Sequence, residues 1–412
     1  MGTLSTVEQR AVDMLDPAPM LAQVLAWSAI NSGSRNLAGL AQMAALLADA
    51  CAPLPGDVAL IAPAPVQVMR ADGALDTLDH GQHLTVRVRP DAPCRLLLTG
   101  HMDTVFPPDH PFQATIWADD NTLNGPGVAD MKGGIAIMLA AIGAVERAMA
   151  QPGGTQPGRA PQFGYDIIIN SDEEVGSLSS APIIAQLARG KAAALTYEPS
   201  ALPDGTLAGA RPGSGNFSIH ITGRAAHAGR NPQDGRNALV AAADLAVRLK
   251  AAVCDGLLIN PAKIDGGSGN NVVPDSAVLR VNIRPRTPQD QAAAQALLDG
   301  LMHAIAVQHD VGVHAHGGFA RPPKLVDGPA ARLFTLVEQA GTDLGLSITH
   351  RDSGGVCDGN NIAACGVPVV DTMGVRGGNI HSAQEYMMVD SLVERAQLSA
   401  VSVLRIIAQG GV

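Results

Sequence analysis

Aromatic residues are scarce in this 412-residue chain, at 3% of the sequence, so its cores must be built mainly from Ala, Val, Leu and Ile. Charged residues are also few, at 16%, whereas hydrophobic residues make up 46%. This balance argues against a disordered chain and is typical of a globular protein. The length exceeds what one ordinary hydrophobic core supports, so we expect two domains.

Basic residues are outnumbered by acidic ones, 28 to 38, and the formal net charge is −10. Because phosphate backbones are bound by clustered Lys and Arg, this balance argues against a nucleic-acid partner. Cysteine is limited to five widely spaced residues with no CxxC pair. This usage predicts free or buried thiols in a reducing compartment: Cys51, Cys94, Cys254, Cys357 and Cys365.

Long hydrophobic runs are missing as well. The most apolar run, Gly133 to Val145, ends at Glu146 and Arg147, and we expect it to be too short to span a bilayer. The N-terminus has no basic start followed by an apolar stretch, so a secretory signal is not expected. These features predict a cytoplasmic protein without a membrane partner.

Up to Gly209, predicted strands and helices alternate along the chain. This alternation predicts an α/β domain with a mostly parallel central sheet flanked by helices. A Gly/Pro-rich loop is expected at residues 151–162. Two helices are expected within residues 17–50, on either side of a turn at 31–36, then strands at 84–90, 94–100, 165–170 and 192–199, with helices at 135–150 and 181–190.

Beyond Gly209 the predicted order changes to β-α-β-β-α-β, which is the ferredoxin-like split unit. The strands are expected at 216–223, 257–264, 276–285 and 311–319, and the helices at 234–252 and 288–308. We therefore expect an inserted α+β domain at residues 213–318. The catalytic domain would consist of residues 1–212 and 319–412, the latter with helices at 331–341 and 393–408 and a strand at 367–374.

Acidic and histidine side chains follow several of the predicted strands. His101 and Asp103 come directly after one buried strand, Glu173 and Glu174 after a second, and Glu198 lies at the end of a third. In open α/β sheets, ligands bind outside the carboxyl ends of the strands, so these residues are expected to converge on one crevice. Two further candidates lie in Gly-containing loops, Asp130 and His381.

A set of two histidines and three carboxylates suits two divalent metal ions that share a bridging carboxylate. Zinc is the expected ion, with Co²⁺ or Mn²⁺ as alternatives. A remaining glutamate would then be available as a general base for a metal-activated water. Each feature alone is common on protein surfaces, and the joint placement after strands is what favours a site.

The sequence resembles the dizinc metallopeptidases and deacylases that include glutamate carboxypeptidase, acetylornithine deacetylase and succinyl-diaminopimelate desuccinylase. The segments GGFARPPK and SGGVCDGNN look most like the glutamate carboxypeptidase branch. The resemblance covers residues 100 to 386 and is carried, in this order, by GHMDTV, GPGVADMKGG, NSDEEVGS, YEPS, GRAAHAG, NVVPDSA and GNIHSAQEY.

The resemblance implies specific roles for the candidate residues. Asp130 would bridge the two metals, and the peptide bond from Asp130 to Met131 would be cis. Glu173 would be the general base, and Asp103 would orient a metal-bound imidazole, as such ligands usually require. One metal would be held by His101, Asp130 and Glu198, and the other by Asp130, Glu174 and His381.

The resemblance also implies substrate contacts. His227 of the inserted domain would stabilise the oxyanion, often in the active site of the partner subunit. Asn271 and Arg284 would bind the substrate's carboxylate and carbonyl, because the planar guanidinium offers two parallel hydrogen bonds. Arg321 and Gly355 are expected as further substrate contacts. A homodimer through the inserted domain is expected as well.

One departure from the glutamate-specific members is visible after YEPS. Those members carry a lysine that contacts the side-chain carboxylate, whereas here LPDGTLAG has Thr206 near the corresponding place. The expected activity is therefore hydrolysis of the amide bond of an N-acyl amino acid or small peptide with a free C-terminal carboxylate. The alternatives are a deacylase of one specific metabolite, an aminopeptidase that reads a free amine, and an inactive binding protein on the same fold.

Overall fold

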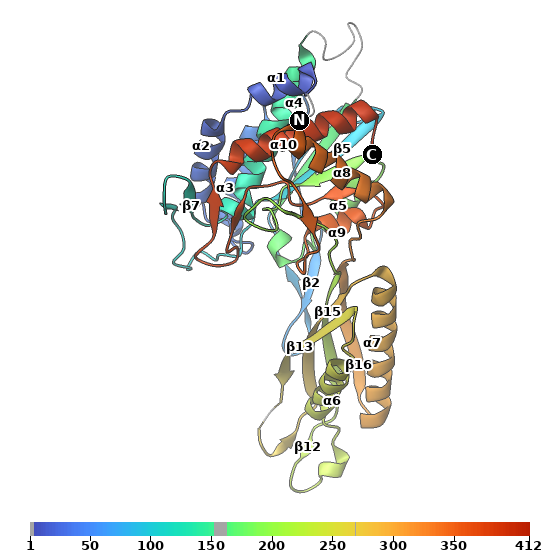
Figure 1. Cartoon of the computed structure of the whole chain (residues 1–412). Coiled ribbons are helices and arrows are strands. Elements are labelled where there is room, and N and C mark those ends of the chain that lie inside the picture. Colours follow the sequence, from blue (N-terminus) through green and yellow to red (C-terminus); the bar gives the residue numbers. More distant parts are fainter. Residues whose placement is uncertain (1–3, 152–162, 268) are drawn as a thin grey trace.

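The computed structural model describes residues 4–151, 163–267 and 269–412, and the chain forms two lobes (Figure 1). The first lobe contains both termini, and the second is formed by the middle of the chain. Apart from Gln151, the Gly/Pro-rich loop expected at 151–162 lies outside the described residues.

The central sheet of the first lobe is mixed, with its parallel half where the sequence predicted it. β8, β5, β9 and β18 run parallel to one another, whereas β4 and β1 pair antiparallel at one edge. Their order in the sheet is β1 (Asp57–Ile61), β4 (His83–Val88), β8 (Phe163–Asn170), β5 (Cys94–His101), β9 (Ala193–Thr196) and β18 (Val369–Val370).

Helices cover both faces of this sheet. Leu96 and Leu98 of β5 belong to the core shared with α4 and α10, whereas Leu97 belongs to a second core shared with α5 and α9. Burial on both faces explains why this strand is an unbroken apolar run. The helices are α1 (Thr6–Asp13), α2 (Pro17–Ser28), α3 (Leu37–Cys51), α4 (Gly133–Ala150), α5 (Ala181–Ala188), α8 (Gly328–Asp343), α9 (Asp358–Ala363) and α10 (Ser391–Gln409).

The apolar run expected to be too short for a bilayer is part of a longer helical segment. With the preceding turn η1 (Val128–Lys132), α4 extends over Val128–Ala150, which by length and composition could cross a membrane. In the structure, 94% of its most apolar window is buried inside the protein, as in the core helix of a globular domain.

The second lobe has the predicted β-α-β-β-α-β order. Its antiparallel sheet runs β13 (Leu257–Gly266), β15 (Ser276–Pro285), β11 (Ser214–Thr222) and β16 (Gly312–Arg321), so the last strand extends past the expected boundary at residue 318. Helices α6 (Ala238–Ala251) and α7 (Pro288–His309) cover one face, over a core that includes Ile219 and Leu279. The short strands β12 (Ala226–His227) and β14 (Val272–Val273) pair beyond this sheet.

A hairpin that was not predicted joins the two lobes. It consists of β2 (Val66–Met69) and β3 (Leu75–Leu78) and lies on the sheet face of the second lobe that the helices leave open (Figure 1). His316 Nε2 lies 2.9 Å from the carbonyl oxygen of Gln67, and Arg280 Nη2 donates to the carbonyl of Met69 over 2.9 Å.

The remaining short elements are β6 (Ile116–Trp117), β7 (Thr122–Asn124), β10 (Leu207–Ala208), β17 (His350–Arg351), β19 (Gly377–Gly378), β20 (Tyr386–Met388), η2 (Glu173–Val175) and η3 (Pro232–Asp234).

Candidate dimetal site

The carboxyl ends of three adjacent parallel strands carry the predicted site residues. His101 is the last residue of β5, Glu173 and Glu174 form the turn η2 that follows β8, and Glu198 follows β9. Because β8, β5 and β9 are neighbours in the sheet, these side chains meet at one edge.

Asp130 reaches the same place from η1, the turn before α4. Its peptide bond to Met131 is cis, as the resemblance implied. The turn is held by Glu385, whose buried carboxylate accepts the backbone N–H groups of Gly127, Ala129 and Asp130 over 3.2, 3.0 and 3.0 Å. Glu385 was not predicted as a site residue, although it lies within the quoted segment GNIHSAQEY.

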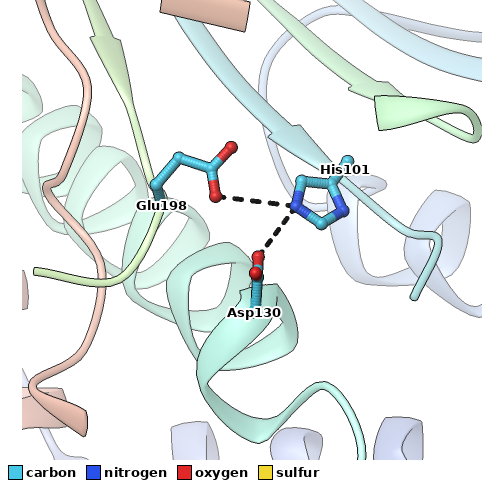
Figure 2. A group of neighbouring side chains, drawn as sticks. All are labelled: His101, Asp130 and Glu198. Carbon is cyan, nitrogen blue, oxygen red and sulfur yellow. Dashed lines mark hydrogen bonds and ion pairs between the residues drawn. The ribbon is translucent and has the colours of Figure 1, made fainter. Parts of the chain in front are cut away.

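Two groups of potential ligand atoms share Asp130. In the first group, His101 Nε2 lies 3.0 Å from Asp130 Oδ1 and 3.6 Å from Glu198 Oε2 (Figure 2). In the second group, His381 Nε2 lies 3.4 Å from Asp130 Oδ2 and 3.1 Å from Glu174 Oε2. The two oxygens of Asp130 therefore face different imidazoles, which is the arrangement of a bridging carboxylate.

The charges of this cluster favour cations. Three carboxylates face two imidazoles, and burial raises the pKa of Glu198 and, together with repulsion by Asp130, raises the pKa of Glu174 to about 7. Hydrogen bonds to Asp130 and Glu174 raise the pKa of His381 to about 11. Ionisation of Glu174 and Glu198 is therefore unfavourable in the protein alone and would be favoured by a bound cation, and a mixed imidazole–carboxylate donor set fits divalent ions such as zinc.

Asp103 contacts both His101 and the turn that contains Glu173 and Glu174. It is fully buried, and His101 Nδ1 lies 3.0 Å from its carbonyl oxygen and 3.4 Å from Oδ1. Its two carboxylate oxygens accept the backbone N–H groups of Glu173 and Glu174, each over 3.1 Å, and Ser34 Oγ donates to Oδ2 over 2.7 Å. One side chain therefore orients an imidazole and the turn that carries two glutamates.

Glu173 is buried, and its closest charged partner is Arg321. Arg321 Nη2 lies 2.6 Å from Glu173 Oε1 and also donates to the carbonyl of Glu173 and to Ser177 Oγ. Burial and repulsion by Glu198 raise the pKa of Glu173 well above its usual range, although Arg321 opposes the shift. Arg321 was predicted to contact the substrate; in the structure its charge already faces Glu173 and, at 3.7 Å, Asp358.

A cavity of about 600 Å³ opens next to the cluster and is lined by both lobes. Arg284 reaches it from the second lobe, and Gly355 lines it from the first. Arg284 Nε donates to Asn282 Oδ1 over 2.9 Å, and Nη1 donates to the carbonyl of Gly354 over 3.1 Å. Both acceptors are neutral, so the positive charge of Arg284 has no carboxylate partner among the described residues.

His227 and Asn271 lie elsewhere in this chain. β12 carries His227 at the end of the second lobe that is remote from the first lobe (Figure 1), and Asn271 adjoins it through the hydrogen bond from Ala228 N to Asn271 O, at 2.8 Å. His227 is exposed, and its Nδ1 accepts the N–H groups of Gly229 and Arg230. Neither residue is among those that line the cavity beside the two groups of potential ligand atoms.

The fold and the paired ligand groups define a metallohydrolase. The chain belongs to Peptidase family M20/M25/M40, whose sequence profile matches residues 97–405. It is 29% identical over 332 residues to carboxypeptidase G2 of Pseudomonas sp., covering 78% of this chain and 76% of that protein. It is 30% identical over 335 residues to succinyl-diaminopimelate desuccinylase of Psychrobacter arcticus, covering 74% and 76%.

The fold is shared with solved structures of the same class. A tripeptidase from Staphylococcus aureus superposes with a TM-score of 0.72 at 24% identity, covering 96% of this chain and all of that one. This agreement confirms the predicted α/β lobe with an inserted α+β lobe.

Proposed function

We propose that this protein hydrolyses the amide bond of an N-acyl amino acid or small peptide with a free C-terminal carboxylate, using two divalent ions. The main observation in support is the pair of imidazole–carboxylate groups that share Asp130. Next to them lies a cavity lined by Arg284, whose guanidinium has no carboxylate partner among the described residues. The proposed ligands are His101, Asp130 and Glu198 for one ion, and Asp130, Glu174 and His381 for the other. Zinc is the proposed ion, with Co²⁺ or Mn²⁺ as alternatives.

Two bound ions would lower the pKa of a water molecule and polarise the scissile carbonyl. Glu173 would take the proton from that water and deliver it to the leaving amine. Its burial and raised pKa suit a group that must both accept and return a proton. Arg321 supports this role by keeping the Glu173 carboxylate in place through the contact at 2.6 Å.

The free carboxylate of the substrate would bind Arg284. Its partners, Asn282 and Gly354, leave Nη2 free of hydrogen bonds among the described residues, so it can donate to an anion. Gly355 lines both the main cavity and a smaller one of about 250 Å³ next to Glu198. This smaller cavity would bind the part of the substrate on the other side of the scissile amide bond. An aminopeptidase, one of the alternatives, needs a carboxylate near the substrate amine instead of this cation.

The chain lacks a lysine at the position of the glutamate-contacting lysine. Thr206 is buried there, and its hydroxyl donates to Asp204 Oδ1 over 2.7 Å. One of the two relatives described above is named a carboxypeptidase and the other a desuccinylase, so the names of the relatives do not separate the two activities. A deacylase of one metabolite therefore stays the second candidate.

We further propose a homodimer in which residues 213–318 form the interface and residues 1–212 with 319–412 form the catalytic part. In one protomer His227 and Asn271 lie remote from the ligand groups, so they would complete the site of the partner subunit. His227 would there donate to the developing oxyanion. A cytoplasmic location is proposed because all five cysteines are free thiols.

The test combines metal analysis with a substrate panel. The purified protein is loaded with zinc and assayed on N-acetyl amino acids, dipeptides with free amines and succinylated amines, with a chelator control. We expect about two ions per chain, cleavage of the N-acyl amino acids, and loss of turnover in Glu173→Gln with the metal retained. Near-native turnover by that variant with full metal would contradict the role of Glu173. Less than one ion per chain would favour the inactive binding protein.

A further inference from the structure

Three asparagines lie side by side across the sheet of the second lobe. The strand register places Asn282 of β15 opposite Asn216 of β11 on one side and opposite Asn260 of β13 on the other. Their chain neighbours Phe217, Val281 and Ile259 are buried in the core beneath the helices, so the asparagines point to the opposite face. We call Asn216, Asn260 and Asn282 the asparagine row.

The asparagine row lines the cavity beside the metal ligands. All three side chains border the same cavity of about 600 Å³ as Glu173 and Arg284. Arg284 is two residues beyond Asn282 on the same strand, so both point to the same face. A substrate residue whose carboxylate binds Arg284 therefore has its own side chain close to the asparagine row.

The hydrogen bonds within the row leave specific groups unused. Both amide atoms of Asn282 are already hydrogen-bonded. Its Oδ1 accepts from Arg284, and its Nδ2 donates to Asn216 Oδ1 over 2.8 Å and to Ser214 Oγ over 3.0 Å. Asn216 Nδ2 and the whole amide of Asn260 have no hydrogen-bond partner among the described residues. The cavity thus offers unpaired donors from two residues and an unpaired acceptor from one.

We propose that the asparagine row selects a C-terminal residue with a neutral amide side chain, glutamine or asparagine. An amide has both a donor and an acceptor, so it matches Asn216 and Asn260 together, whereas an apolar side chain would leave their amides without partners. Within this cavity a second carboxylate would lack a cation, because Arg284 binds the first carboxylate and Arg321 faces Glu173. This inference deepens the proposed function and rests on it for the position of the substrate carboxylate.

The test measures selectivity instead of activity alone. The zinc-loaded enzyme is assayed on N-acetyl-L-glutamine, N-acetyl-L-glutamate and N-acetyl-L-leucine. We expect kcat/KM for the glutamine substrate to exceed each of the other two about tenfold, because one hydrogen-bonded group discriminates by that order. In Asn216→Leu the preference for glutamine over leucine should disappear. Thr222→Leu, on the same face of β11 but away from the cavity, should leave the ratios unchanged.

Two results would overturn the proposal. One is an Asn216→Leu enzyme with the glutamine-to-leucine ratio of the wild type. The other is a preference for glutamate that Lys250→Ala abolishes, since Lys250 lines an adjoining cavity with Asn260 and would then be the receptor of the second carboxylate.

Binding measurements separate this proposal from the proposed function. Calorimetry with the metal-loaded Glu173→Gln variant gives the affinity for each of the three N-acetyl amino acids without hydrolysis. Tighter binding of the glutamine compound without turnover by the wild type would contradict only the proposed hydrolysis. Turnover of all three compounds without discrimination in rate or affinity would contradict only the role of the asparagine row.

Discussion

The affinity of Arg284 for a substrate carboxylate should depend on the neutrality of its neighbour Asn282. Asn282 Oδ1 accepts the hydrogen bond from Arg284 Nε over 2.9 Å, and the exchange Asn282→Asp would keep this acceptor while adding a full negative charge. A substrate carboxylate on the outer nitrogens of the guanidinium would lie about 6 Å from that charge. With an effective dielectric constant of about 20, the repulsion is about 2.8 kcal/mol, or about a hundredfold in affinity.

We therefore expect Asn282→Asp to raise KM for an N-acyl amino acid about a hundredfold, with a smaller change in kcat. Asn282→Ala is the matched control, because it also loses the hydrogen bonds to Asn216 and Ser214 but adds no charge. The difference between the two variants should shrink as salt is added. Steady-state kinetics at two ionic strengths measures it, and equal KM values for the two variants would refute the idea that Arg284 acts through an uncompensated charge.

Three further predictions concern the metal ligands and the dimer. Asp103→Asn should weaken metal binding about 10- to 100-fold in a metal titration, because the carboxylate orients His101; unchanged affinity would contradict this. Removing the ions with a chelator should lower Tm, since the buried carboxylates lose their counter-charges, and an unchanged Tm would argue against bound metal. A 1:1 mixture of His227→Ala and Glu173→Gln subunits, unfolded and refolded together, should recover about a quarter of the wild-type activity, since half of the dimers then hold one complete site. An inactive mixture of confirmed dimers would show that His227 does not act in trans.

The chemistry of the strand ends could be predicted from the sequence. The runs CRLLLTGH and YDIIIN are apolar because both faces of the sheet are covered, and polar residues follow them at once. Since parallel strands end at a common edge, His101, Glu173 and Glu198 had to lie near one another once the strands were recognised as neighbours. The β-α-β-β-α-β order of the second lobe was equally visible, because each element has its own hydrophobic period.

The partner of each charged side chain was not predictable in this way. Arg321 was expected as a substrate contact and lines the cavity, but its ion pair with Glu173, which is far from it in the sequence, was not foreseen. Glu385 holds the turn of Asp130 across a still longer separation in sequence, and the β2–β3 hairpin is held against the second lobe by hydrogen bonds between its backbone carbonyls and side chains of that lobe. Periodicity reports which face of an element is buried and carries no information about which distant group it meets.

The sequence by itself determined the two-lobed α/β architecture and the set of candidate ligands for two metal ions, because local hydrophobic patterns and polar residues at strand ends are sufficient for both. Only the tertiary structure decided that Arg284 lines the cavity without a carboxylate partner among the described residues, and which other side chains line that cavity. Asn216, Asn260 and Asn282 are unremarkable in three separate strands. They become one surface beside Arg284 only when the order and register of those strands are known, since pairing between strands is a property of the folded chain.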